Sequence, residues 1–265
     1  MSTAEAGRER RQGGVESVLR ALRLLDCFEQ GRPEMSLGDF VRCTGYSKTT
    51  TYRLLLTLEE AGWLERSDGA GFRLTIKPFL VGSILVDSLE MRHEAGAVMR
   101  RLVAETDRTA YLTVPSGTHA VCLERIDGEH PLRIADLHVG GTQPLHLGAG
   151  PRAILAWGEE ELLPALLAEG LTGRTPTSLV QPDALIADLA ASRKRGYTIS
   201  DEDVTAEVAA LGMPVFDASG RAVAALSIGG LRSAVLPPRP EQLEHLRHAC
   251  DVLSRRLGHR GPQPA

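Results

Sequence analysis

The chain has 265 residues, of which 43% are hydrophobic and 24% are charged. This composition is typical of a globular protein and excludes disordered, collagen-like and coiled-coil chains, while the length predicts two domains of ordinary size. The formal net charge of −4 excludes a uniformly basic coat for nucleic acid but allows a local basic face.

The sequence has no apolar run of the roughly 20 residues that a membrane span needs, and its first residues lack the apolar core of a signal peptide. Four cysteines, Cys27, Cys43, Cys122 and Cys250, lie far apart and form no CxxC pair. They predict neither a zinc site nor a disulfide framework and are typical of a reducing compartment. We therefore expect a cytoplasmic protein without membrane contact.

Residues 1–14 are expected to form a flexible arm in which Arg8, Arg10 and Arg11 cluster. Residues 1–78 carry slightly more basic than acidic side chains, whereas the rest of the chain is acidic. This asymmetry favours an anionic partner for the first third of the chain.

The first predicted helix has apolar residues at three- and four-residue spacing, which indicates one buried face. The members of this face are Val15, Val18, Leu19, Leu22, Leu25 and Phe28. Gly31 and Pro33 end the helix. Ser36 is then expected to cap a second, short helix with the sequence LGDFVRC.

The third predicted helix has the sequence KTTTYRLLLTLEEA, with Ser47 as its cap and Gly62 after its end. A short turn that contains Gly45 joins it to the second helix, which predicts a helix-turn-helix unit. The stripe expected to face the core is Thr51, Leu54, Leu55 and Leu58, and the opposite stripe is Lys48, Thr49, Tyr52 and Arg53. A recognition helix presents its N-terminal residues to the major groove, so the hydroxyls and cations there predict contacts to DNA.

A β-hairpin is predicted from Trp63 to Ile76, because WLERS and FRLTI flank the turn DGAG. A hairpin directly after such a helix is typical of a wing that lies along the neighbouring DNA backbone. Small three-helix units with a hairpin also serve as protein docking modules, so this alternative stays open. The polar half of the third helix and the basic arm favour nucleic acid.

The pattern changes near Pro78, and residues 78–262 are expected to form a linker helix and a second domain. The linker carries a set of apolar residues, namely Leu80, Ile84, Leu85, Leu89 and Met91. Because these side chains are too apolar to leave in water, we expect at least a dimer through this segment. Beyond it, strand-like and helix-like runs alternate, which indicates an α/β or α+β domain.

Three blocks of the sequence resemble the isocitrate-lyase-regulator (IclR) family of bacterial transcription factors. The winged-helix domain of that family resembles VESVLRALRLLDCF, SLGDFVRCTGYSKTTTYRLLLTLEEAGWLER and FRLT. Its strand-to-helix segment resembles GGTQPLHLGAGPRAILAW, and its C-terminal signature resembles RKRGYTISDEDVTAEVAALGMPVFDASGRAVAALSIGG. The likeness runs from Val15 to Leu257. It implies an α+β protein with a winged helix-turn-helix in residues 15–77, a linker helix that pairs subunits and a GAF-like α/β effector-binding domain.

The resemblance also implies function and site residues. A family member is a dimer or tetramer that binds double-stranded operator DNA and a small-molecule effector. It controls catabolic genes, here expected as a repressor, with an activator as the alternative. Matched by position, the DNA-facing residues are Lys48, Thr49, Thr50, Tyr52 and Arg53. The implied effector pocket is lined by Ala149, Gly150, Ser200, Ala210, Ser227 and Gly229.

The effector positions depart from those of family members that bind glyoxylate or pyruvate. Such members tend to have an Asp, a Cys and a second Ser where this chain has Ser200, Ala210 and Gly229. The usual Gly-Lys at the helix start is Pro151-Arg152 here. Smaller side chains predict a roomier pocket and a ligand larger than a two- or three-carbon oxoacid. Free N–H groups at the start of the PRAIL helix favour a carboxylate at one end of that ligand.

Motifs for catalysis and metal binding are absent or incomplete. His245 and His248 lie three apart on a predicted helix without a third ligand, so we expect surface histidines there and a structural role for His146. The acidic run Asp201-Glu202-Asp203 is expected to be a solvated loop. The HExxH, GxSxG, P-loop and GxGxxG motifs do not occur. We expect no catalytic residue, metal or cofactor; the alternative is a small-molecule-binding sensor or enzyme whose N-terminal unit docks protein.

Overall fold

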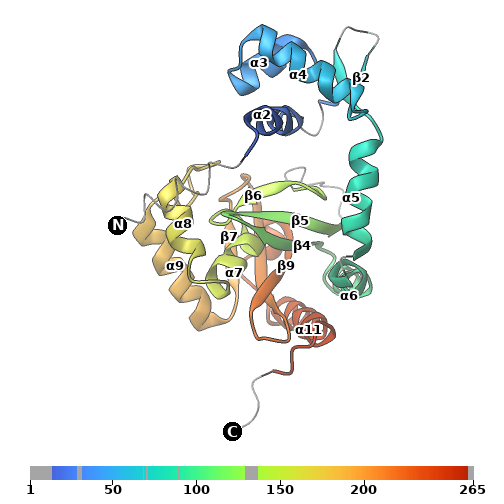
Figure 1. The fold of residues 1–265 in the computed structure, drawn as a ribbon. Helices are drawn as coiled ribbons and strands as arrows, with labels where there is room; N and C mark the ends of the chain where they lie inside the picture. Colours follow the sequence, from blue (N-terminus) through green and yellow to red (C-terminus); the bar gives the residue numbers. More distant parts are fainter. Residues whose placement is uncertain are drawn as a thin grey trace, which may run out of the picture. The chain divides into compact units, whose positions relative to one another are not determined.

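The computed structural model describes residues 14–28, 32–67, 69, 71–88, 90–128 and 137–261, with the backbone alone for residues 83–88 and 90. The chain divides into two compact units, Met1–Ser88 and Leu89–Ala265 (Figure 1). The change of pattern near Pro78 predicted a boundary after residue 77, whereas the helix that begins at Lys77 belongs to the first unit.

The first unit is a winged helix-turn-helix followed by one further helix, and this part of the predicted fold is confirmed. In chain order its elements are α2 (Glu16–Leu25), β1 (Glu34–Met35), α3 (Leu37–Thr44), α4 (Lys48–Glu60), β2 (Leu64–Arg66), β3 (Phe72–Leu74) and α5 (Lys77–Ser88). The three strands form an antiparallel sheet with β3 in the middle. β2 and β3 are the wing.

The ends of the helices in the helix-turn-helix follow the predicted signals. The Ser36 side chain accepts the N–H of Asp39, and the Asp39 carboxylate accepts the N–H of Ser36. Hydrogen bonds from Ser36 lower the pKa of Asp39 to about 2. Gly45 after α3 has a left-handed conformation with φ of 70°, and Ser47 caps α4 by accepting the N–H of Thr50.

α2 differs from the prediction in the face that it buries. The core of the first unit consists of Leu24, Cys27, Met35, Phe40, Leu55, Leu58, Leu64 and Phe72. Leu24 in the last turn of α2 is fully buried, but Val15, Val18, Leu19 and Leu22 are between 47% and 63% exposed. Apolar spacing shows that a helix is two-faced, but it does not show which neighbour covers the apolar face. The expectation of one buried face was therefore wrong for most of α2.

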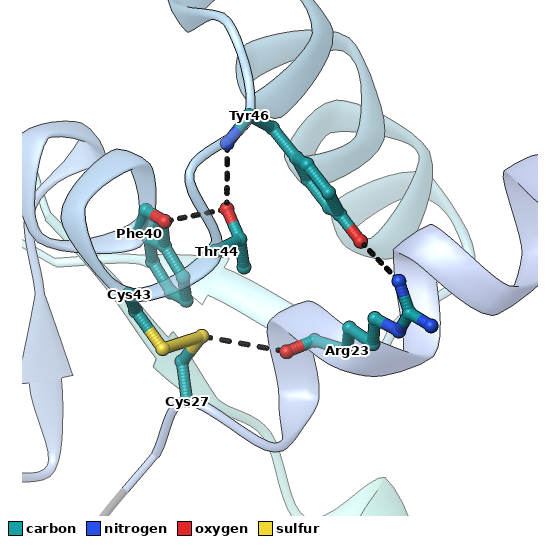
Figure 2. The surroundings of a disulfide bond; sticks show 6 residues. All are labelled: Arg23, Cys27, Phe40, Cys43, Thr44 and Tyr46. Carbon is teal, nitrogen blue, oxygen red and sulfur yellow. Dashed lines mark hydrogen bonds between the residues drawn. A yellow bond between two sulfur atoms is a disulfide. The ribbon is translucent and has the colours of Figure 1, made fainter.

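Cys27 and Cys43 are joined by a disulfide, which corrects the expectation that no cysteines pair (Figure 2). Cys27 follows the end of α2 and Cys43 lies in the last turn of α3, with their Cα atoms 6.2 Å apart. This distance is within the range that a disulfide spans. The spacing in the sequence could not reveal the pair, because it depends on how the two helices cross. Cys122 and Cys250 are free and buried, and burial raises the pKa of the Cys122 thiol to about 12.

The second unit is built on a six-stranded antiparallel sheet with the strand order β6-β5-β4-β9-β8-β7. Its strands are β4 (Thr109–Ser116), β5 (His119–Ile126), β6 (Thr142–Pro144), β7 (Thr198–Asp201), β8 (Val208–Phe216) and β9 (Ala222–Leu231). Its helices are α6 (Glu90–Thr106), α7 (Ala149–Trp157), α8 (Leu162–Glu169), α9 (Pro182–Arg195), α10 (Arg232–Val235) and α11 (Pro240–Arg256). The α/β character predicted for this domain is confirmed.

Helices cover both faces of this sheet (Figure 1). α6 and α11 pack with Leu211, Leu226 and Ile228 of the strands to form the larger core. α7, α8 and α9 form a second core on the other face, which includes Ile154 and Leu185. Successive residues of a strand point to opposite faces, so the residues between the large apolar ones of β9 face α7. Among the described helices, none is both long and apolar enough to cross a membrane.

Candidate DNA-binding and effector sites

The N-terminal half of α4 presents an exposed polar face. The exposed residues are Lys48, Thr49, Tyr52 and Arg53, and the buried residues are Thr51, Leu55 and Leu58. Thr50, the fifth predicted DNA-facing residue, is half-buried, and its hydroxyl oxygen accepts a hydrogen bond from Ser47 Oγ at 2.9 Å. Thr50 therefore belongs to the cap of the helix, and the other four side chains are open to solvent.

Arg66 at the end of β2 connects the wing to this face, although the sequence did not single it out. Its guanidinium carbon lies 5.8 Å from the centre of the Tyr52 ring and 4.8 Å from that of Phe72. Its Nη2 donates to the Tyr52 hydroxyl at 3.4 Å, and its Nε lies 3.3 Å from Oε1 of Glu59. The arginine of the WLERS run, two residues before the DGAG turn begins, was the signal for this contact.

A groove of about 580 Å³ lies between α2 and α4. Val18 and Leu22 line it from α2, and Thr49, Arg53 and Leu54 line it from α4. The exposed apolar face of α2 and the polar face of α4 are therefore neighbours on the surface of the first unit.

Four of the six predicted effector residues lie on the face of the sheet that α7 covers. Ser200, Ala210 and Gly229 are cross-strand partners on β7, β8 and β9. Ser227 precedes Gly229 by two residues on β9 and points to the same face. These four residues come from three strands, and the sheet register brings them together.

The other two predicted effector residues open α7, which lies directly on that face. A Cβ atom added to Gly150 would be 2.9 Å from Oγ1 of Thr113 and 3.1 Å from Oγ of Ser227, so the helix approaches the sheet as closely as a glycine permits. Thr198 Oγ1 donates to the carbonyl oxygen of Ala149 at 2.6 Å. The structure thus places all six predicted residues in one region.

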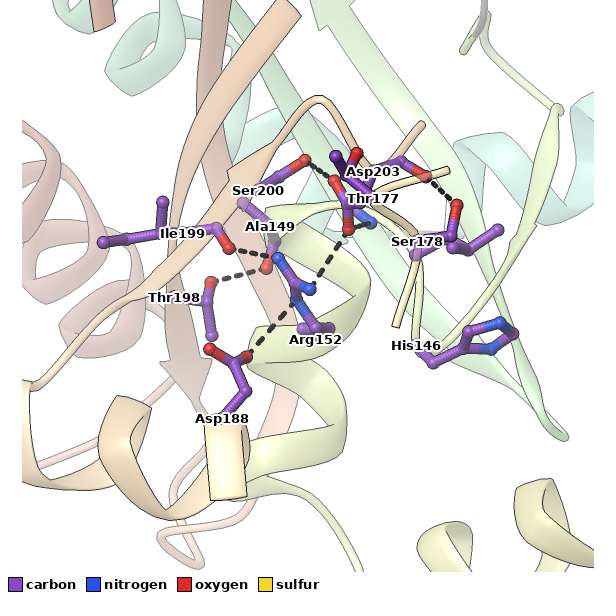
Figure 3. A network of polar contacts seen from close by, with 12 residues as sticks. His146, Ala149, Arg152, Thr177, Ser178, Asp188, Thr198, Ile199, Ser200 and Asp203 are labelled. Carbon is purple, nitrogen blue, oxygen red and sulfur yellow. Dashed lines mark hydrogen bonds and ion pairs between the residues drawn. The ribbon is translucent and has the colours of Figure 1, made fainter. Parts of the chain in front are cut away.

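A buried polar cluster surrounds Arg152 in α7 (Figure 3). Its Nη1 lies 3.1 Å from Oδ2 of Asp203, and its Nε lies 3.6 Å from Oδ2 of Asp188. Its Nη2 donates to the carbonyl oxygen of Ile199. Arg152 and Asp203 are each 2% exposed. The sequence placed Arg152 beside the effector residues, but it did not reveal this ion pair.

Asp203 also contacts the beginning of α7. Its Oδ2 accepts the N–H of Gly148, the residue that precedes the helix, at 3.1 Å. Its Oδ1 accepts a hydrogen bond from the hydroxyl of Ser200. The expectation of a solvated loop is therefore wrong at Asp203, which the cation of Arg152 and the helix start draw into the interior.

Two of the three histidines considered from the sequence contact oxygen atoms of the protein, and His248 is exposed. Nε2 of His146 lies 2.9 Å from the carbonyl oxygen of Thr172, and burial lowers the pKa of His146. Nδ1 of His245 lies 3.0 Å from Oε2 of Glu105. Within the described residues, no group of three or more His, Cys, Asp or Glu side chains is placed to hold a metal ion.

A winged helix-turn-helix joined to a separate α/β domain defines a class of DNA-binding transcriptional regulators. Comparison with known families identifies the family within this class. The family profile described as the IclR helix-turn-helix domain matches residues 17–68. The profile described as the bacterial transcriptional regulator IclR C-terminal domain matches residues 84–255. The chain belongs to the IclR family of bacterial transcriptional regulators.

Relatives of this chain are similar over almost its whole length. The HTH-type transcriptional regulator XynR of Escherichia coli is 33% identical, over 92% of this chain and 98% of that protein. The transcriptional repressor IclR of the same organism is 30% identical, over 86% of this chain and 84% of its own.

Solved structures have the same fold. An IclR-type regulator from a Silicibacter species is 29% identical and has a TM-score of 0.80, over 94% of this chain and 100% of that one. An IclR homologue from Microbacterium hydrocarbonoxydans, solved in complex with 4-hydroxybenzoate, is 23% identical and has a TM-score of 0.76, over 91% of this chain and 99% of that one.

Proposed function

We propose that this regulator acts in the cytoplasm, binds operator DNA through α4 and the wing, and represses catabolic genes until a small organic effector binds. The observation that carries the proposal is the exposed face of α4, where Lys48, Tyr52 and Arg53 lie beside a wing that Arg66 ties to the same helix. Cations and hydroxyls on such a face suit phosphates and base edges. The relatives IclR and AllR of Escherichia coli, both named as repressors, support the sign of regulation.

We infer that the effector binds on the α7 side of the sheet and carries a carboxylate on a body larger than that of glyoxylate or pyruvate. A Cβ atom added to Gly229 would meet its neighbours no closer than 3.5 Å, so the position accommodates a larger residue than the glycine that this chain has. Ala210, its cross-strand partner, is similarly small. The complex of the Microbacterium homologue with 4-hydroxybenzoate supports an aromatic acid as a candidate.

We further propose a dimer or tetramer whose contact includes α5. Apolar residues at and before the start of this helix are between 50% and 67% exposed, namely Ile76, Phe79, Leu80 and Val81. An apolar surface of this kind is typical of a contact with another chain. The side chains of Ile84, Leu85 and Leu89, which the sequence also assigned to the contact, lie outside the described residues. Met91 packs against the core of the second unit.

DNA from beside the gene that encodes the protein tests the proposal. In fluorescence anisotropy, we expect the protein to bind this DNA more tightly than unrelated DNA of equal length, and the logarithm of the affinity to fall linearly with the logarithm of the salt concentration. Equal affinity for both DNAs at every salt concentration would contradict an operator-binding function. A promoter reporter then shows whether the protein represses or activates, because loss of a repressor raises expression and loss of an activator lowers it.

A further inference from the structure

The start of α7 already holds a carboxylate, and it belongs to the protein itself. Asp203 accepts the N–H of Gly148 at 3.1 Å and a hydrogen bond from the Ser200 hydroxyl, and it lies 3.1 Å from Nη1 of Arg152. An N–H at a helix start, a hydroxyl and a guanidinium are the kinds of donor that hold the carboxylate of a bound ligand. The three side chains are at most 5% exposed, so bulk water competes little for these donors.

We propose that Asp203 is the internal occupant of the effector's anion position, and that the carboxylate of the effector replaces it there. The inference rests on the function proposed above and specifies how its site responds, because binding exchanges one carboxylate for another. The ligand class is then an organic acid whose carboxylate takes the donors of Asp203 and whose body lies beside Ala210 and Gly229.

Arg152 is arranged to keep its place during the exchange. Its Nη2 donates to the carbonyl oxygen of Ile199, a contact that does not involve Asp203. Among the described residues, its buried Nε has no hydrogen-bond partner, and neither has the facing Oδ2 of Asp188 at 3.6 Å. Nε of the guanidinium therefore keeps its ion-pair partner Asp188 when Asp203 leaves.

The charge of Arg152 decides which ligands can displace Asp203. A buried cation that loses its anionic partner is strongly destabilised, because nothing replaces the lost hydration. A carboxylate ligand replaces the anionic partner that Arg152 loses, whereas a neutral ligand of the same shape leaves the cation with Asp188 alone, at 3.6 Å from its Nε. The exchange is therefore selective for anions, and the amide of an effector acid is expected to fail.

Asp203 lies in a turn between β7 and β8 whose position depends on side-chain contacts. Glu202 and Glu207 in this turn have φ of 57° and 63°, in the left-handed region that residues with a side chain rarely adopt. The carbonyl oxygens of Glu202 and Asp203 accept hydrogen bonds from the hydroxyls of Thr175 and Ser178, each at 2.7 Å. Release of the Asp203 carboxylate removes a contact that holds this turn against α7. The exchange of carboxylates therefore frees two parts to move, namely this turn and the segment that carries Thr175 and Ser178.

Acetate is a suitable probe, because it supplies a carboxylate and little else. Full-length wild type and Asp203→Ala are titrated with sodium acetate against sodium chloride at equal ionic strength, and the unfolding temperature and operator affinity are measured. Asp188→Ala is the matched control. Asp188 is the other carboxylate beside Arg152, but it faces Nε of the guanidinium instead of the start of α7. Acetamide, of similar size and without charge, is the control ligand.

An internal occupant that fills a site about nine-tenths of the time weakens the apparent affinity of a competing ligand about tenfold. We therefore expect acetate to bind Asp203→Ala at least about tenfold more tightly than wild type, to raise the unfolding temperature of this variant and to change its operator affinity. Asp188→Ala is expected to respond to acetate as the wild type does. Acetamide should have no effect on any of the proteins.

Asp203→Asn covers the case in which Asp203→Ala does not fold, because the amide keeps the volume of the side chain but removes its charge. Acetate should then bind D203N more tightly than wild type, with a smaller gain. An equal effect of acetate on all the proteins overturns the exchange and makes Asp203 a structural partner of Arg152 only. A wild-type protein that does not bind operator DNA contradicts the proposed function instead, and the unfolding measurements, which need no DNA, keep the two failures apart.

Discussion

Arg66 of the wing and Tyr52 of the recognition helix are in direct contact. The guanidinium carbon lies 5.8 Å from the ring centre, and Nη2 donates to the hydroxyl oxygen at 3.4 Å. Tyr52 is 41% exposed, so the pair lies on the surface that we assign to DNA. The position of the wing and the orientation of an aromatic side chain on α4 therefore depend on each other.

Arg66→Ala is expected to weaken operator binding about fivefold to tenfold, because it removes a cation–π contact worth roughly 1 kcal/mol and frees the wing. Arg66→Lys should not restore binding, since lysine lacks the planar guanidinium that stacks on the ring. Arg73→Ala, on the neighbouring strand of the wing, removes the same charge without this contact. Anisotropy titrations that show equal losses for Arg66→Ala and Arg73→Ala would reduce the role of Arg66 to its charge.

Arg53→Ala is expected to abolish operator binding and leave the fold intact. Arg53 is exposed on the polar face of α4, and the loss of one good base contact costs roughly 1–3 kcal/mol, which a dimer loses twice. Arg20→Ala on α2 is the control for the loss of a positive charge. The measurements are gel shift for binding and circular dichroism for the fold. Unchanged operator affinity of Arg53→Ala would show that the DNA-binding face is wrongly placed.

The double substitution Phe79→Asp and Val81→Asp is expected to convert the dimer to a monomer and to remove tight operator binding. Both side chains are at least 50% exposed on α5, and charges there oppose burial against a second chain. Ile186→Asp on α9, at a side chain that is 46% exposed, should leave the assembly unchanged. Light scattering after gel filtration gives the masses. A wild-type monomer at micromolar concentration that still binds operator tightly is the contrary result.

Ala210→Phe is expected to block the response to the effector without weakening DNA binding, because it fills the space beside Gly229 in the second unit. Ala187→Phe, at an exposed position of α9, is the size-matched control. Operator release or tightening is titrated with benzoates, glyoxylate and pyruvate in wild type and both variants. A normal response of Ala210→Phe means that the pocket lies elsewhere. Glyoxylate or pyruvate as the tightest ligand means that the argument from small side chains fails.

Reduction of the Cys27–Cys43 disulfide is expected to lower the free energy of unfolding of the first unit by about 3 kcal/mol, since the bond closes a loop with a sequence separation of 16. Urea unfolding followed by Trp63 fluorescence, in a Trp157→Phe background, isolates this unit. Cys43→Ser should match the reduced protein and be insensitive to reductant. Identical midpoints with and without reductant would show that the bond does not stabilise the unit.

The sequence predicted the helix-turn-helix well because its signals are local. Ser36, Gly45 and Ser47 act within one turn of where they stand, and each lies where the capping rules place it. The exposed face of α2 and the Cys27–Cys43 bond were missed for the opposite reason. Both depend on how helices pack against one another, and the spacing of residues within one helix does not determine that packing.

In the effector region, too, the sequence predicted some residues of the site and missed another. The family resemblance supplied Ser200, Ala210 and Gly229, which the sheet register then brings into one row. Asp203 was missed because an acidic run in a loop is usually solvated. Its partner at the start of α7, Gly148, is 55 residues away in the sequence, so only the folded chain shows that the carboxylate is internal.

The close approach of Gly150 to the sheet restricts the mechanics of the second unit. With Thr113 and Ser227 already at the distance where one added carbon would collide, α7 has no free travel toward β4 and β9. Any displacement of the helix on ligand binding must therefore be a slide along the sheet or a movement away from it. A helix whose approach to the sheet is blocked converts a displacement at its N-terminus into translation along the sheet or lift away from it.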